Sequence, residues 1–140
     1  MIVQSADADD KILKCWNVIH ELRPHLKHEE FLNSMKAMQS EGVKMFYIEE
    51  DGMAVSAGVF RMNYYFARGK NIYIDDLSTL PAYRGKGYGS HILKAIKNYA
   101  VENNCDNIHL DSGHHRYDAH RLYLNFGFQI SSHHFALKLN

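Results

Sequence analysis

The sequence has no net charge and no long apolar run. Sixteen Lys and Arg residues balance sixteen Asp and Glu residues among the 140 of the chain, so no overall field draws the protein to nucleic acid or to an anionic membrane. The aromatic residues lack an interleaved basic patch, which also disfavours a nucleic-acid-binding protein. No segment approaches the roughly 20 apolar residues that a membrane-spanning helix requires. Any anion site must therefore be local.

Cysteine is scarce, and no targeting segment is recognisable. Cys15 and Cys105 lie far apart and form no C-x-x-C motif, so we expect both to be reduced, as in cytosolic proteins. The first residues, MIVQSADADD, lack the basic start and apolar core of a signal peptide. The length suits one domain, and we find no repeat, linker or low-complexity tract. The sequence thus predicts a cytoplasmic protein with a single domain over residues 1–140.

Hydrophobic periodicity and turn residues predict ten elements around one sheet. The first are an edge strand at 2–3, a helix within 5–22 and a helix that begins in the stretch 28–38 and ends at Gly42. Two strands within 43–62 then form a hairpin turning at Asp51-Gly52. The rest are a strand at 71–80, a helix at 88–103, a strand at 107–112, a helix at 118–126, and a final strand or pair of strands at 128–139. Residues 64–70 are expected to form a loop. The order β-α-α-β-β-β-α-β-α-β predicts an α/β fold, or an α+β mixture, with a mixed sheet.

Three of the nine glycines fall within five positions, in the stretch RGKGYGS at 84–90. This stretch lies between a predicted strand and a predicted helix. Backbone amides at a helix N-terminus have no partner inside the helix and attract anions. The glycines let these amides close around a large anion, and Arg84 and Lys86 add positive charge. The stretch predicts a phosphate or diphosphate site; the alternative is a solvated turn whose glycines only cap strand and helix.

Other phosphate-binding motifs fit this stretch less well. It lacks the G-x-x-x-x-G-K-[ST] spacing of a Walker A loop. In a dinucleotide fingerprint, Ser90 would replace the third glycine, although Asp111 lies about 20 residues further on, where a ribose-binding acid would stand. Only one clear strand-helix-strand unit is predicted, which disfavours a dinucleotide-binding fold.

The pattern [QR]-x-x-G-x-[GA], fulfilled by residues 84–89, resembles the acetyl-CoA loop of the GNAT superfamily of N-acetyltransferases. The stretch LYLNFGF at 122–128 resembles a later motif of that family. The element order is also the family's, so the resemblance covers nearly the whole chain. It implies a GNAT-like acyl-CoA N-acyltransferase fold that moves the acetyl group of acetyl-CoA to a primary amine of a small molecule, by direct attack in a ternary complex.

An alternative from another class is a catalytically silent domain that binds acetyl-CoA as a sensor or partner module. Many family members form dimers, and a homodimer is compatible with this sequence, although no segment indicates one.

The resemblance also implies which residues bind the co-substrate. In the family, the strand before the loop splays from its neighbour and pairs with the pantetheine arm, and the loop amides bind the diphosphate. The corresponding residues are Leu77, Ser78 and Thr79 on the strand, and Arg84, Gly85, Lys86, Gly87, Tyr88, Gly89 and Ser90 in the loop. The sequence itself indicates an irregular strand, because the apolar phase slips by one residue across Asp75-Asp76. Such a slip is typical of a β-bulge; the alternative is a loosely alternating strand end.

Acetyl transfer to an amine needs a base, because a free amine is mostly protonated at neutral pH. Asp75 and Asp76 are the candidates, with Asp75 slightly favoured. Adjacent strand residues point to opposite faces, so one would face the acceptor, but a bulge would blur which. Both carboxylates could instead bind a cationic substrate. The resemblance places Tyr123 as the acid that protonates the leaving thiolate; the alternative is a packed core tyrosine.

The chain has ten histidines, including the pairs His114-His115 and His133-His134. No H-x-x-x-H or H-E-x-x-H spacing is present and no cysteine accompanies them, so we expect no metal ion. Some histidines are expected to line the acceptor pocket. The segment 115–124 resembles aminoalkylphosphonate N-acetyltransferases, which implies that His114, Arg116 and His134 meet an anionic group of the acceptor.

Overall fold

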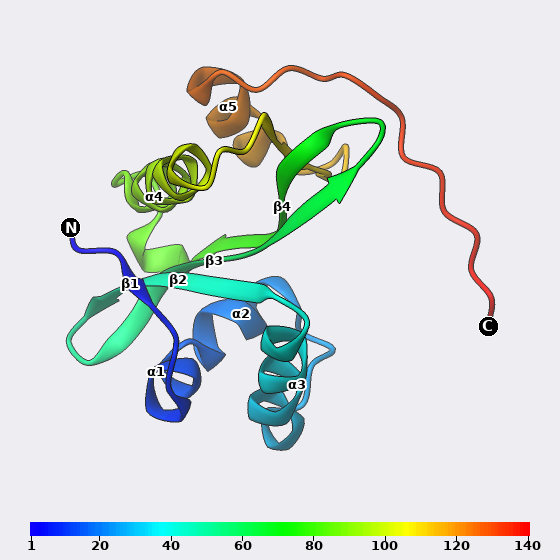
Figure 1. The fold of residues 1–140 in the computed structure, drawn as a ribbon. Coiled ribbons are helices and arrows are strands. Elements are labelled where there is room, and N and C mark those ends of the chain that lie inside the picture. Colours follow the sequence, from blue (N-terminus) through cyan, green and yellow to red (C-terminus); the bar gives the residue numbers. More distant parts are fainter. The chain divides into compact units, whose positions relative to one another are not determined.

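The computed structural model describes residues 1–140, which form two compact units. Residues 1–110 hold the sheet and most of the helices, and residues 111–140 hold one helix and the C-terminal segment (Figure 1). No helix is both long enough and apolar enough to span a bilayer. The single domain over 1–140 stays a prediction.

The first unit is built on one five-stranded sheet. Its strands are β1 (Gln4–Ser5), β2 (Val43–Glu50), β3 (Met53–Tyr65), β4 (Gly69–Thr79) and β5 (Asn107–Leu110). They lie in sequence order; all neighbours are antiparallel except β4 and β5, which are parallel. The predicted mixed sheet is confirmed. The hairpin turn is also as predicted, since Asp51 and Gly52 both have positive φ, of 52° and 80°, as a two-residue connection demands.

Helices cover both faces of this sheet. They are α1 (Asp9–Lys14), α2 (Trp16–Leu22), α3 (His28–Ser40) and α4 (Tyr88–Glu102), with a short 3-10 turn η1 (Pro81–Tyr83) before α4. Figure 1 shows α1, α2 and α3 on one face and α4 on the other. Ile12, Val18 and Met35 pack against β2 and β3 on the first face. On the other face, Phe46 of β2 meets the ring of Tyr99 of α4. Two buried layers therefore fix β4 and the start of α4, which flank the glycine stretch.

Several predicted boundaries differ from the structure. The edge strand expected at residues 2–3 lies instead at Gln4–Ser5, because these residues pair with β2 while Ile2 is exposed. The first predicted helix is two helices, α1 and α2, which meet at Cys15. The predicted loop at 64–70 is much shorter, because Tyr64 pairs with Lys70 and Tyr65 with Gly69 at the end of the β3–β4 hairpin. Tyrosine favours strands, and the pairing with β4 lets β3 continue through both of them.

The second unit contains α5 (Tyr117–Phe126), and the predicted strand at 128–139 is wrong. Phe135, Leu137 and Leu139 keep the alternation on which that prediction rested, yet their side chains are 92%, 86% and 88% exposed. A strand needs a neighbour for its backbone hydrogen bonds, and these residues pair with none. An alternation of apolar and polar residues is therefore not sufficient to predict a strand without a partner strand.

The two thiols differ in environment, which gives a direct test of the core. Cys15 is fully buried, and this burial raises the pKa of its thiol to about 12, whereas Cys105 is half-buried. Because the thiolate is the reactive form, we expect Cys105 to react with DTNB in the native protein and Cys15 only after denaturation. Cys105→Ser should abolish the native reaction. A native reaction that persists in this variant would contradict the buried position of Cys15.

Candidate active site

A β-bulge interrupts β4 where the sequence predicts it. Val59 of β3 pairs with Asp76, and the next residue, Phe60, pairs with Ile74. Asp75 is therefore the extra residue, with no partner across β3. The bulge indicated by the slip of the apolar pattern is confirmed.

The bulge places both aspartates on one face of the sheet. Asp76 pairs with Val59, which belongs to the core beneath α1, α2 and α3. Asp75 contacts Arg61, which lies two residues along β3 from Val59 and so on the same face. The expectation that the two carboxylates point to opposite faces is wrong, because the bulge absorbs one step of the alternation.

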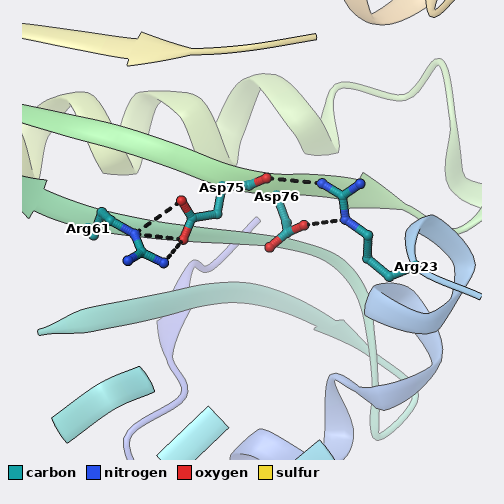
Figure 2. Close-up of polar contacts among 4 residues, drawn as sticks. All are labelled: Arg23, Arg61, Asp75 and Asp76. Carbon is teal, nitrogen blue, oxygen red and sulfur yellow. Dashed lines mark hydrogen bonds and ion pairs between the residues drawn. The ribbon is translucent and has the colours of Figure 1, made fainter. Parts of the chain in front are cut away.

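An arginine holds each carboxylate, but to a different extent (Figure 2). Arg61 contacts both oxygens of Asp75: its Nε lies 3.2 Å from Oδ1 and 3.0 Å from Oδ2, and its Nη2 lies 2.6 Å from Oδ2. These hydrogen bonds raise the pKa of Arg61 above its ordinary value. Arg23 donates from Nε to Oδ1 of Asp76 at 2.7 Å, and Oδ2 of Asp76 has no partner. Of the two carboxylates, Asp76 keeps one oxygen available.

Beyond the bulge, β4 has an open edge. The pairing of β5 with β4 covers only Asn71 to Ile74, while β4 continues to Thr79. The predicted pantetheine-binding residues 77–79 lie in this stretch, paired with β3 on one side and with no strand on the other. An open strand edge presents backbone groups that an extended ligand can pair with. The divergence of the two strands stays a prediction, because β5 ends at Leu110 with all of its residues paired to β4.

The glycine stretch leads from this edge into α4 and leaves a run of amides free. Gly85 and Gly87 have φ of 75° and 89°, and Gly87 is the N-cap of α4. The amide of Arg84 donates to the carbonyl of Pro81 at 3.3 Å, whereas the amides of 85–90 have no acceptor within the protein. A Cβ at Gly85 would meet no atom within 4 Å, so the space beside the loop is open. A diphosphate of acetyl-CoA fits such a site.

Two side chains of this loop are engaged elsewhere. Arg84 donates from Nε to the carbonyl of Thr79 at 3.0 Å, which ties the loop to the end of β4. Tyr88 is buried, and its hydroxyl donates to Oε1 of Glu50 at 2.9 Å; this hydrogen bond raises the pKa of Tyr88. Tyr88 can therefore offer a ligand its amide but not its side chain. Lys86 is exposed.

In the second unit, Tyr123 lies near the end of α5. Gly127 ends the helix with φ of 115°, and the amide of Phe128 turns back to donate to the carbonyl of Tyr123 at 3.0 Å. The Phe128 ring packs edge-on against the Tyr123 ring, at 5.8 Å between centroids. Burial raises the pKa of Tyr123 above its ordinary value, and the hydroxyl makes no hydrogen bond within the protein. It is therefore a protonated, unengaged donor at neutral pH.

The three residues predicted to bind an anionic acceptor group also lie in the second unit. His114, Arg116 and His134 are all exposed, and no hydrogen bond or ion pair joins any two of them. His134 Nδ1 lies 3.6 Å from Oδ1 of Asp111. Their role stays a prediction. No three His, Cys, Asp or Glu side chains are grouped closely enough to hold a metal ion.

The sequence analysis missed the two arginines. Arg61 carried a weak signal, as a charged residue within an otherwise apolar run of a predicted strand. Arg23 carried none, because it follows a helix by one residue, 53 positions from its partner Asp76. Only the fold brings these residues together.

A sequence model described as the acetyltransferase (GNAT) family matches residues 9–128. The chain is 32% identical over 119 residues to the uncharacterized N-acetyltransferase YhdJ of Bacillus subtilis, covering 82% of each chain. It is 36% identical over 56 residues to the thialysine N-epsilon-acetyltransferase of Bos taurus, covering 40% of this chain and 33% of the bovine one. The solved structure named "Putative acetyltransferase from Agrobacterium tumefaciens str. C58" aligns over 99% of both chains, with a TM-score of 0.85 and 23% identity. This likeness supports the fold.

The chain belongs to the acetyltransferase (GNAT) family. It is an acetyl-CoA-dependent N-acetyltransferase, and acetyl-CoA is its co-substrate. The fold and co-substrate expected from the glycine stretch and the LYLNFGF motif are confirmed.

Proposed function

We propose that this protein transfers the acetyl group of acetyl-CoA to a primary amine of a small molecule, by direct attack in a ternary complex. The observation that supports this most is the continuity of the open β4 edge with the free amides of 85–90. Together they offer one path for an extended ligand that ends in a diphosphate. The two aspartates lie at the start of that path. We further propose that the protein acts in the cytoplasm.

In this proposal the loop and the strand divide the binding of acetyl-CoA between them. The amides of 85–90, at the N-terminus of α4, bind the diphosphate. The backbone of Leu77, Ser78 and Thr79 pairs with the pantetheine arm. The Ser56 hydroxyl stiffens this part of β4, because it donates to the carbonyl of Ser78 at 3.2 Å and lies 2.9 Å from Oγ1 of Thr79.

We assign Asp76 as the base. The amine nitrogen attacks the thioester carbonyl, forming a carbon–nitrogen bond while the carbon–sulfur bond breaks. The amine proton passes to Oδ2 of Asp76, the carboxylate oxygen that no side chain occupies, directly or through a water molecule. Arg61 occupies both oxygens of Asp75, which argues against the slight preference for Asp75 expected from the sequence. Tyr123 gives its hydroxyl proton to the departing thiolate.

The acceptor is proposed to be a small amine rather than a nucleic acid or a membrane component. The bovine relative is named for thialysine, whose side chain ends in a primary amine, and this compound is a sensible first candidate. The exposed His114, Arg116 and His134 would favour acceptors that also carry a carboxylate, phosphate or phosphonate.

The proposal is tested by a screen of acceptors with the purified full chain. CoA release from acetyl-CoA is followed with thialysine, aminoalkylphosphonates, polyamines and amino acids, and the acetylated product is identified by mass spectrometry. We expect at least one primary amine to raise CoA release well above the rate in buffer. If CoA binds but no amine exceeds the buffer rate, the silent sensor becomes the better explanation.

A further inference from the structure

We propose that Arg23 is a positioning residue for acetyl transfer, because it fixes both the β4 bulge and the carboxylate of Asp76. This inference rests on the proposed role of Asp76 as base. Arg23 lies outside the sheet, at the end of α2, and the inference adds it to the residues on which the rate of acetyl transfer depends.

The first support is the backbone of the bulge. A bulged residue is left out of the strand ladder, so its backbone groups need other partners. Arg23 Nη2 donates to the carbonyl oxygen of Asp75 at 3.2 Å. Figure 2 shows this contact beside the contact to Asp76, both made by one guanidinium. Arg23 therefore donates hydrogen bonds to the backbone of Asp75 and to the side chain of Asp76.

The second support is the way Arg23 itself is held. Its backbone amide donates to the carbonyl of Ile19 at 2.9 Å, and its own carbonyl accepts from the amide of Leu26 at 3.1 Å. Its side chain is 40% exposed and that of Asp76 is 18% exposed, so the ion pair lies at the margin of the core. An arginine anchored at its backbone and planar at its tip loses little freedom when it makes two hydrogen bonds.

Arg23 and Arg61 thus do different things. Arg61 donates hydrogen bonds only to the carboxylate of Asp75 and none to the backbone of the bulge. Arg23 directs Asp76 through Oδ1, which leaves Oδ2 in one defined orientation. A base displaced by about 1 Å can lower the rate about 100-fold, so loss of Arg23 should appear in the rate of the chemical step rather than in co-substrate binding.

The test is a kinetic comparison of Arg23→Met and Arg23→Lys with wild type, using the best acceptor from the screen. We expect Arg23→Met to lower kcat by roughly 10- to 100-fold, with the dissociation constant of acetyl-CoA unchanged. Arg23→Lys should recover only part of this loss, since one ammonium cannot reproduce the paired donors of the guanidinium. Adding guanidinium ions to Arg23→Ala, at concentrations that leave wild type unaffected, should restore part of kcat.

Lys14→Met is the matched control for stability. Lys14 joins the end of α1 to Glu49 of β2 at 2.8 Å, through side chains that are 37% and 26% exposed. The Lys14→Met substitution therefore removes a similar ion pair between a helix and the sheet, but one that lies outside the proposed site. We expect its melting temperature to fall about as far as that of Arg23→Met, with kcat unchanged. If both variants lose kcat equally, Arg23 is only a structural tether and the inference is overturned.

A double-mutant cycle separates this inference from the assignment of the base. If Arg23 acts through Asp76, Arg23→Met should cause no further loss of kcat in an Asp76→Asn background. Full additivity of the two losses would overturn the positioning role. If Asp76→Asn abolishes activity while Arg23→Met behaves as wild type, the inference fails and the base assignment stands. If Asp76→Asn is fully active, the assignment of Asp76 as base fails, and the positioning role of Arg23, which rests on it, fails with it.

Discussion

Tyr123→Phe should lower kcat/KM for the acceptor amine by roughly 10² to 10⁴, the usual contribution of a placed general acid. Only the hydroxyl is lost, so the edge-on packing against Phe128 and the stability of the fold should change little. The loss should appear mainly in kcat, because the proton is needed in the transition state and not for binding. Steady-state CoA release measures this, with calorimetry to check that CoA affinity is unchanged.

Tyr117→Phe is the control for this variant. Tyr117 lies on the same helix but is 69% exposed, and we expect its kinetics to match wild type. The pH profile adds a second readout: because the pKa of Tyr123 is raised, the hydroxyl keeps its proton to higher pH than an ordinary tyrosine. The acid form, and with it the activity, is lost only as pH rises through that raised pKa. A Phe variant within threefold of wild type would leave Tyr123 as a packing residue.

Asp76→Asn should lower kcat by a similar factor, roughly 10² to 10⁴, because an amide cannot accept the proton of the amine. The change keeps the size of the side chain, and its oxygen can still accept the Arg23 hydrogen bond. The remaining activity should rise with pH, since more of the amine is then already unprotonated. Rates of CoA release across a pH series give both results.

Asp75→Asn is the companion variant and should lose less. Both oxygens of Asp75 already accept hydrogen bonds from Arg61, so this carboxylate is less available to the amine proton than Oδ2 of Asp76. The reverse order, with Asp75→Asn inactive and Asp76→Asn near wild type, would return the base to Asp75. Equal and small losses would indicate that the pair only attracts a cationic substrate.

The parts of the fold that follow from local patterns could be predicted from the sequence. Asp51-Gly52 predicted the hairpin because few residues tolerate positive φ at both turn positions. The slip of the apolar phase across Asp75-Asp76 predicted the bulge, since side-chain direction has a period of two along a strand. The glycines of 85–89 predicted a loop with free amides. Each of these three features is determined by a few consecutive residues.

Features that depend on distant residues could not be predicted in this way. The shared face of Asp75 and Asp76 depends on how β4 pairs with β3, and their arginine partners come from two other elements. The prediction of a strand at 128–139 was wrong because a strand needs a partner strand for its hydrogen bonds, and the local sequence does not determine whether one is present. Similarly, Tyr88 belongs to the glycine motif, yet its hydroxyl is bound to Glu50, 38 positions away.

The measurement that tests the account most directly is the affinity of CoA for Gly87→Ala and Gly42→Ala, by calorimetry. Both glycines have positive φ, of 89° and 95°, and at neither would an added Cβ meet a protein atom closer than 3.8 Å. Both variants should therefore carry a similar backbone strain, of about 1–2 kcal/mol, but only Gly87 lies among the free amides. We predict that Gly87→Ala weakens CoA binding by about 10- to 100-fold, the loss expected when hydrogen bonds to a charged ligand are disturbed, while Gly42→Ala binds CoA as wild type does. Equal CoA affinity in both variants, or binding of NAD in place of CoA, would contradict the proposed co-substrate site.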